Sequence, residues 1–313
     1  MWSRLLCSAL PHSSRPWCSA RAFSRSVSSA SAYELLEVEH CENTHVTTVR
    51  LNRPSKYNAM NPTLWTEIGA AFRSIGDPTS DSGISLSRVV LLEGAGKHFT
   101  SGLDLNEAAP VFGAIWYDEQ LDTARKALRM QALVRQFQEC FTAVEQCPVP
   151  VIAAIHGLCL GAGVDLIAAC DVRYASEEAA FAVKEVDVGL AADVGTLQRV
   201  PKLIGNHSLF RELCYTGRQF TAEEALDLGL LSGVLDSPEL LRRHTRQLAE
   251  EIGRKSPVAV MGTKRSLNYS RDHSVAAGLD HIATWNAAML QTEDMQESLM
   301  ASMEKRTPTY KHL

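Results

Sequence analysis

The sequence has no long apolar run and no excess of basic residues. No uninterrupted apolar stretch in its 313 residues reaches the ~18 residues that a membrane-spanning helix needs, so no membrane span is predicted. Lysine and arginine number 31 against 36 aspartates and glutamates, which gives a formal net charge of −5. Proteins that bind nucleic acid attract phosphates with a basic surface, so this balance argues against a nucleic-acid partner.

Cysteine pairs and cofactor motifs are missing as well. The eight cysteines form no C-x-x-C pair, and no metal-ligand spacing is present. We therefore predict reduced thiols, mostly in the core, and no metal site. The chain has no phosphate-binding loop and no Ser-His-Asp order, and Gly161-x-Gly163 lacks the third glycine of a dinucleotide-binding motif. No cofactor is predicted.

Acidic residues are absent from the N-terminus as far as Glu34. The first 33 residues contain ten serines and four arginines, a composition typical of a mitochondrial transit peptide. Arg21-Ala22-Phe23-Ser24 resembles a matrix-protease cleavage site, and cleavage after Phe23 would remove three arginines and take the charge from −5 to −8. We predict a transit peptide with a disordered linker over 1–32 and a mitochondrial-matrix location; a tail without a targeting role is the alternative.

Short apolar runs alternate with helical patterns after the presequence, which predicts an α/β domain with helices covering the sheets. Strands are expected over residues 33–38, 45–51, 87–93 and 149–155. Helices are expected over 61–75 and, after a polar stretch, over 121–147. Beyond residue 236 the pattern is helical only, with helices over 237–255, 257–268, 275–291 and 292–305. We divide the chain into a core over 33–236 and a helical region over 237–313, which should pack against the core or another subunit.

Two glycine-containing turns each follow a buried strand, at residues 94–104 and 156–165. Small residues let a ligand approach the backbone, and free N–H groups at a helix start attract negative charge. Two such turns side by side could each offer one N–H to a single oxygen, which is an oxyanion hole. Tight turns without a ligand remain the alternative at this point.

Three carboxylates follow among small or apolar neighbours: Asp165, Glu185 and Asp193. An acid in such surroundings is costly unless it is paired, solvated or used. Burial raises the pKa of a carboxyl group, which can then take and give a proton near neutral pH. Taken singly, each could also be a helix cap or a surface acid.

The order of these motifs resembles the enoyl-CoA hydratase/isomerase (crotonase) superfamily from about Val46 to Gln291. The matching segments are F-T-S-G-L-D-L (99–105), H-G-L-C-L-G-A-G-V-D-L (156–166), A-C-D-V-R (169–173) and K-E-V-D-V-G-L-A-A-D-V-G-T-L-Q-R (184–199). The resemblance implies a spiral of ββα turns, a helical C-terminal trimerisation region and a fatty acyl-CoA substrate. It also implies an oxyanion hole from the backbone N–H groups of Leu103 and Ala162. Alanine stands at 162 where the family usually has glycine, and its methyl would crowd the thioester if the backbone were glycine-like.

The third acid indicates the branch of the family. Hydratases resemble this chain at Asp165 and Glu185 but usually carry glycine at the position of Asp193. The stretch 184–195 is instead similar to dienoyl-CoA isomerases, which implies conversion of 3,5-dienoyl-CoA to 2,4-dienoyl-CoA in β-oxidation. By position in this resemblance we place Glu185 near C2 and Asp193 near C6, with Asp165 tuning them or supporting the intermediate. A hydratase, a simple enoyl isomerase and a non-enzymatic RNA-binding relative are the alternatives.

The remaining charged residues have less specific interpretations. Lys56 and Lys264 are candidates to meet CoA phosphates, and the resemblance implies a homo-oligomer, a trimer or a dimer of trimers. Asp104 and Asp171 are expected to cap turns, and Asp187 to be structural. The C-terminal Lys311-His312-Leu313 partly resembles a peroxisomal address, so a second location is open. A basic stripe on the long helix is interpreted as a solvent-exposed face: Arg125, Lys126, Arg129 and Arg135.

Overall fold

The computed structural model describes residues 33–75, 77 and 86–311. The predicted transit peptide and the last two residues of the C-terminal tripeptide lie outside the described residues. None of the described helices is long and apolar enough to cross a membrane.

Six strands form the larger sheet, in the order β1-β2-β3-β4-β6-β9. β1 is antiparallel to β2, and the other neighbours are parallel. β3 and β4 are fully buried and almost entirely apolar, Glu93 of β3 being the one charged residue, as expected for parallel strands covered by helices on both faces. The strands are β1 (Leu36–Cys41), β2 (Val46–Leu51), β3 (Val89–Gly94), β4 (Val151–Ile155), β6 (Val172–Ser176) and β9 (Gly233–Leu235).

Three short strands form a second sheet, in the order β5-β7-β8. The chain passes from the large sheet to the small one twice in succession, from β4 to β5 and from β6 to β7. A helix or turn follows each pair, so the path is a spiral of ββα turns, which confirms the predicted fold class. The elements are β5 (Leu158–Leu160), α4 (Ala162–Ala168), β7 (Ala180–Ala182), the 3-10 helix η3 (Glu185–Val188) and β8 (Phe220–Thr221).

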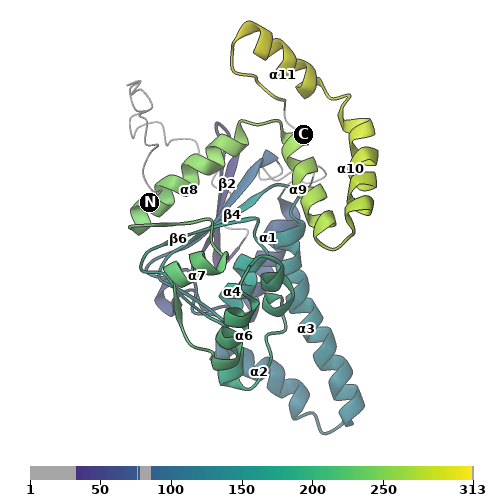
Figure 1. The fold of residues 1–313 in the computed structure, drawn as a ribbon. Helices are drawn as coiled ribbons and strands as arrows, with labels where there is room; N and C mark the ends of the chain where they lie inside the picture. Colours follow the sequence, from purple (N-terminus) through teal and green to yellow (C-terminus); the bar gives the residue numbers. More distant parts are fainter. Residues whose placement is uncertain (1–32, 76, 78–85, 312–313) are drawn as a thin grey trace.

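Helices cover both faces of the spiral (Figure 1). α1 packs along the long helix α3, where Trp65 stacks on Phe141 at 4.6 Å between ring centroids. α8 covers the other side of the large sheet with Leu241 and Ala249. The core helices are α1 (Pro62–Ser74), α2 (Leu105–Trp116), α3 (Thr123–Gln146), α5 (Thr196–Arg199), α6 (His207–Thr216), α7 (Ala222–Leu228) and α8 (Pro238–Gly253), with 3-10 turns η1 (Pro54–Lys56) and η4 (Val200–Lys202).

The C-terminal helices stand partly away from the sheets (Figure 1). α9 packs against α10, and the chain after α11 returns to the core, where Arg88 donates hydrogen bonds to the carbonyls of Tyr310 and Lys311 at 2.8 and 3.1 Å. These helices confirm the predicted helical C-terminus: α9 (Pro257–Arg271), α10 (Val275–Met289) and α11 (Glu293–Glu304).

Two predicted elements need correction. The first strand begins at Leu36 rather than at Tyr33, because the N–H groups of Glu34 and Leu35 donate to the Glu67 carboxylate instead of to a neighbouring strand. The stretch read only as polar contains the helix α2, capped by Asp104. Pro110 lies inside that helix and hides it from sequence patterns, since proline rarely occurs in a helix interior.

Candidate active site

The two glycine-containing turns lie side by side, as predicted. Thr100 bridges Cys159 in a short parallel pairing. Its N–H donates to the carbonyl of Leu158 at 2.9 Å, and its carbonyl accepts from the N–H of Leu160 at 3.2 Å. The hydrogen bonds fix the position of one turn against the other.

The two predicted oxyanion donors sit at the ends of this pairing. Within the described part of the chain, neither the Leu103 N–H nor the Ala162 N–H donates a hydrogen bond to protein. Ala162 is the first residue of α4, where a helix leaves its N–H groups unpaired. The sharp bend falls on Gly161, whose φ is +49°, while Ala162 is helical. The alanine therefore has no glycine-like backbone, and the condition under which its methyl would crowd the thioester is not met.

Asp165 lies one turn into α4 and is completely buried. Its Oδ1 accepts a hydrogen bond from the backbone N–H of Thr196 at 2.5 Å, while its Oδ2 is buried without a partner. Burial, together with the charge of Glu185, raises the pKa of Asp165 to about 7, against the lowering effect of Thr196. Asp165 is therefore able to change protonation state near neutral pH.

Glu185 opens η3 and lies over the start of α4. A methyl group on Gly161 would sit 3.3 Å from Glu185 Oε1, so the carboxyl is next to the residue that precedes the Ala162 amide. Glu185 Oε2 is buried without a hydrogen-bond partner. Burial raises the pKa of Glu185, and the charge of Asp193 raises it further.

Asp193 lies at the rim of the same group. Part of its surface is exposed, yet the surrounding protein covers the carboxyl enough to raise its pKa. Its backbone carbonyl accepts from Gln138 of α3 at 2.6 Å. The structure thus brings the three predicted acids together, because the charges of Glu185 and Asp193 both act on Asp165.

No cation faces these three carboxyl groups: among the described residues, none of them takes part in an ion pair. Elsewhere acids such as Asp104 are paired, and Arg53 lowers the pKa of Asp104. A site with two free amides and three unpaired acids can polarise a carbonyl oxygen and move protons on nearby carbons.

Three residues that support the acids were not found from the sequence. Thr196 binds Asp165 through its backbone N–H, and the Gln138 side chain binds the backbone carbonyl of Asp193, so neither contact joins two side chains that a sequence pattern could pair. Arg199 was inside the quoted motif at 184–199 and could have been noticed there. It donates a hydrogen bond to the carbonyl of Val194 at 3.2 Å, directly after Asp193.

The two lysines proposed from the sequence differ in position. Lys264 is only 5% exposed, and its Nζ bonds Asp171 at 2.7 Å and the carbonyl of Val149 at 3.0 Å. Two of its three N–H groups thus bind protein, and burial favours a structural role for Lys264 over a phosphate contact. Lys56 is exposed at the end of η1 and remains available.

The acids expected to be structural do bind protein groups. Asp104 caps α2, Asp171 accepts from the Val151 N–H at 2.7 Å, and Asp187 pairs with Lys184 at 2.7 Å. Two members of the basic stripe pair with acids of their own hairpin, Arg125 with Asp122 and Arg129 with Asp118. The six described cysteines are free thiols, and five of them are buried.

The spiral of ββα turns brings two free backbone amides next to three carboxyl groups that have no cationic partner. This arrangement suits acid–base chemistry on a carbonyl compound. The chain belongs to the enoyl-CoA hydratase/isomerase family, whose model matches residues 41–312. It is 50% identical over 274 residues to a rat protein named mitochondrial Delta(3,5)-Delta(2,4)-dienoyl-CoA isomerase, covering 88% of this chain and 81% of that one. A peroxisomal Arabidopsis thaliana protein of the same activity name is 44% identical over 90% of this chain and 99% of that one. The crystal structure of a Bacillus anthracis enoyl-CoA hydratase is 32% identical, with a TM-score of 0.76 over 89% of this chain and 99% of that chain.

Proposed function

We propose that this protein isomerises 3,5-dienoyl-CoA to 2,4-dienoyl-CoA in fatty acid oxidation. Relatives 44–50% identical over most of the chain carry that activity in their names. The observation that supports it most directly is the third acid: Asp193 joins Asp165 and Glu185 in one group without a compensating cation.

The first step is removal of a proton from C2 by the Glu185 carboxylate. The C2–H electron pair moves into the conjugated system and places negative charge on the thioester oxygen. The amides of Leu103 and Ala162 stabilise this oxygen because they donate no other hydrogen bond within the described residues. Glu185 suits the step, since its raised pKa makes it a stronger base than an exposed glutamate.

The second step is delivery of a proton to C6 by Asp193, which enters the cycle protonated. The dienolate collapses, the carbonyl re-forms, and the double bonds end between C2–C3 and C4–C5. At the end Glu185 holds the proton from C2 and Asp193 is ionised, and proton exchange with solvent restores both acids. C2 and C6 are several bonds apart, so one carboxyl group cannot easily serve both carbons. Asp165 donates no proton to substrate in this scheme; burial and the charges of Glu185 and Asp193 raise its pKa, so its protonation responds to the state of these two acids.

The test is a parallel spectroscopic assay of a 3,5-dienoyl-CoA and a 2-enoyl-CoA. We expect rapid formation of the 2,4-diene and slow hydration of the 2-enoyl substrate. In deuterated water the product should carry deuterium at C6. The likeness to a hydratase, together with Asp165 and Glu185, supports enoyl-CoA hydratase as the second candidate. Fast hydration with no diene shift would establish that candidate instead.

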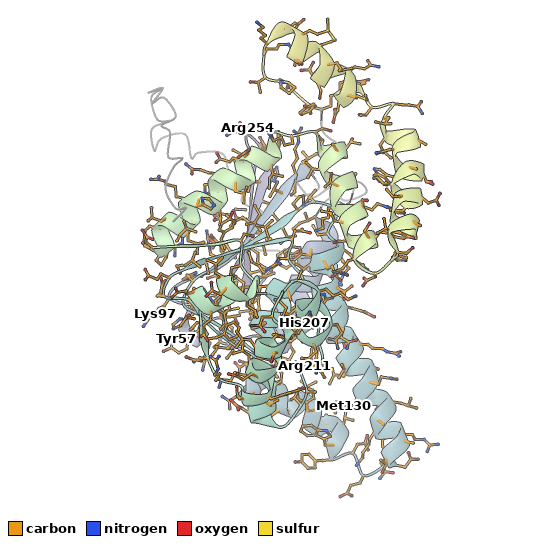
Figure 2. All side chains as sticks on the ribbon, in the orientation of Figure 1. Tyr57, Lys97, Met130, His207, Arg211 and Arg254 are labelled. Atoms are coloured by element: carbon orange, nitrogen blue, oxygen red, sulfur yellow. The ribbon has the colours of Figure 1, made fainter. Side chains whose placement is uncertain are left out.

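For the CoA end of the substrate we propose Lys56. The neighbouring Tyr57 is exposed and packs edge-on against His98 at 5.0 Å between ring centroids. Figure 2 shows Tyr57 and Lys97 at the same edge of the molecule, so a second ammonium group accompanies Lys56. Lys56→Ala should raise KM for acyl-CoA several-fold while leaving kcat unchanged.

We also propose that the protein is a homo-oligomer, a trimer or a dimer of trimers, assembled through the helices after residue 236. A cavity of about 560 Å³ opens between α9, α10 and α11. Large apolar side chains are exposed on the same helices: Leu267, Val275, Leu279, Leu290, Leu299, Met300 and Met303. Such a patch is typical of a protein interface. Light scattering should give the mass of three or six subunits.

For location we propose the mitochondrial matrix, with residues 1–32 as the transit peptide. The rat relative is named mitochondrial and the Arabidopsis relative peroxisomal, so the C-terminal tripeptide could serve as a second address. A reporter fused to residues 1–40 should enter mitochondria, and changing its four arginines to glutamine should abolish import. A cytosolic wild-type fusion would contradict the proposal.

A further inference from the structure

A cluster of charged side chains connects the loop that bears Asp193 to the C-terminal helices. We call it the Glu145 network; its members are Glu145, Arg199, Lys202, Arg271 and Asp272. Glu145 of α3 lies at its centre and pairs with Arg199 of α5 at 3.3 Å and with Arg271 of α9. Asp272 follows α9 and pairs with Arg271 at 3.2 Å and with Lys202 of η4.

Arg199 extends this network to the backbone of the catalytic loop. One guanidinium nitrogen donates to the carbonyl of Val194 at 3.2 Å, and the other bonds Glu145 and the Thr142 hydroxyl, the latter at 3.1 Å. A methyl group on Gly195 would lie 1.9 Å from the first nitrogen, and Gly195 has a φ of +144°. Only glycine leaves room for the guanidinium to cross the loop at this point.

The loop is thereby held at its acid and directly after it. Gln138 donates to the carbonyl of Asp193 at 2.6 Å, and Arg199 binds the next carbonyl along the chain. Two residues later, the Thr196 N–H binds Asp165 at 2.5 Å. Three attachments within residues 193–196 leave the Asp193 backbone little freedom to move relative to Asp165.

The Arg199–Glu145 pair is well covered, with side chains 12% and 15% exposed. Removing ions from water is costly, so such a pair is weak evidence of a gain in stability alone. The planar guanidinium of Arg199 instead fixes the geometry, because it binds a carboxylate, a hydroxyl and a carbonyl at once. The arginines also lower the pKa of Glu145, which keeps it ionised.

We propose that Arg199, oriented by Glu145, is a positioning residue for Asp193 and therefore controls the proton transfer at C6 separately from that at C2. Arg271 of α9 also pairs with Glu145 and so links the Arg199–Glu145 pair to the C-terminal helices. The inference rests on the proposed isomerase function, with Glu185 acting at C2 and Asp193 at C6. A purely structural network would affect both proton transfers alike.

The test compares the two transfers in deuterated water with full-length protein and a 3,5-dienoyl-CoA. Exchange at C2 of recovered substrate reports on Glu185, and deuterium at C6 of the product reports on Asp193. For Glu145→Gln and Arg199→Gln we expect product formation to fall about 10-fold while C2 exchange stays within about 2-fold, in line with partial loss of one acid–base contribution. Arg199→Lys keeps the positive charge but lacks the planar guanidinium that donates to several acceptors at once, so it should recover only part of the lost product formation.

Arg306→Gln is the matched control, because Arg306 also bonds two glutamates, Glu297 and Glu304, but does not contact the catalytic loop. It should leave both transfers unchanged. Equal loss of C2 exchange and C6 labelling in Glu145→Gln, or no loss of either, would overturn the inference. A wild-type protein that forms no 2,4-diene would instead reject the isomerase function itself. If Arg199→Gln fails to fold, Glu145→Gln still decides the question.

Discussion

The acids of the active site and the acid of the Glu145 network differ in what faces them. Asp165, Glu185 and Asp193 have apolar or acidic neighbours and no cation, and their pKa values are raised. Glu145 is also covered by protein, but two arginines lower its pKa. Burial alone therefore does not decide whether a carboxyl group can exchange protons; the charge beside it does. The fold uses paired acids to fix geometry and unpaired acids to move protons.

The largest effect should come from removing a proton-transferring acid. Asp193→Asn keeps the shape of the side chain but cannot take up or release a proton. General acid–base groups typically contribute ~10²–10⁴-fold, so the rate of dienoyl isomerisation should fall by that order. Acyl-CoA binding, measured by calorimetry, should persist because the Leu103 and Ala162 amides are intact. Full isomerase activity in Asp193→Asn would rule out the two-acid mechanism and leave only the family assignment.

A second test changes the protonation of Asp165 in the folded state. Its pKa of about 7 exceeds the ordinary value of 3.8, so the folded state binds more protons than the unfolded state between these values. Stability therefore falls as pH rises through this window and is constant above it. Between pH 5 and pH 8 the loss from this group should be about 3 kcal/mol, at ~1.4 kcal/mol per pKa unit.

Urea unfolding at the two pH values measures this loss. Asp165→Asn should lack the corresponding slope and be more stable than wild type at pH 8, since its amide can still accept from the Thr196 N–H. An identical pH slope in the two proteins would show that Asp165 is not the titrating group.

The three acids of the active site could be predicted from the sequence, because they lie in local motifs. The glycines and the short apolar strands before them predicted the turns, and the resemblance of the stretches 156–166 and 184–199 to the family indicated the three acids. The helix starting at Pro62 was predicted from Asn61, whose side chain accepts from the Leu64 N–H at 2.9 Å. In each case the signal and the structure lie within a few residues of each other.

The paired acids could not be predicted in this way, because their partners are distant in the sequence. Glu145 and Arg271 are 126 residues apart, and Lys264 and Asp171 are 93 apart. Lys264 looked like an exposed lysine in a helical pattern, yet it is buried by the packing of α9 against the core. A side chain's partner across the fold leaves no local pattern, so the sequence could not distinguish a phosphate-binding lysine from a buried ion pair.

Lys264 offers a test in which a paired acid loses its cation. Lys264→Met retains most of the side-chain volume but leaves Asp171 with only the Val151 N–H. Breaking a buried ion pair typically costs 3–5 kcal/mol; because Asp171 is a quarter exposed, we expect about 2 kcal/mol by urea unfolding. KM for acyl-CoA in the surviving folded protein should be unchanged, in contrast to Lys56→Ala. A large rise in KM with normal stability would restore Lys264 as a CoA ligand.

The smallest effect should come from Glu145→Gln, which removes a charge but keeps a hydrogen-bonding side chain. The folded pKa of Glu145 lies below the ordinary value of 4.5, so its contribution to stability is fully present above that value. The contribution is lost as pH falls through the lowered folded pKa. At pH 7 the variant should unfold at about 1 kcal/mol lower free energy, the net value of a typical hydrogen-bonded contact. As pH falls through the folded pKa of Glu145 the two proteins should converge, the reverse of the dependence expected for Asp165. If the difference in unfolding free energy between wild type and Glu145→Gln grew in acid, Glu145 would be protonated in the folded protein. The distinction between ion-paired and unpaired acids would then not hold for Glu145.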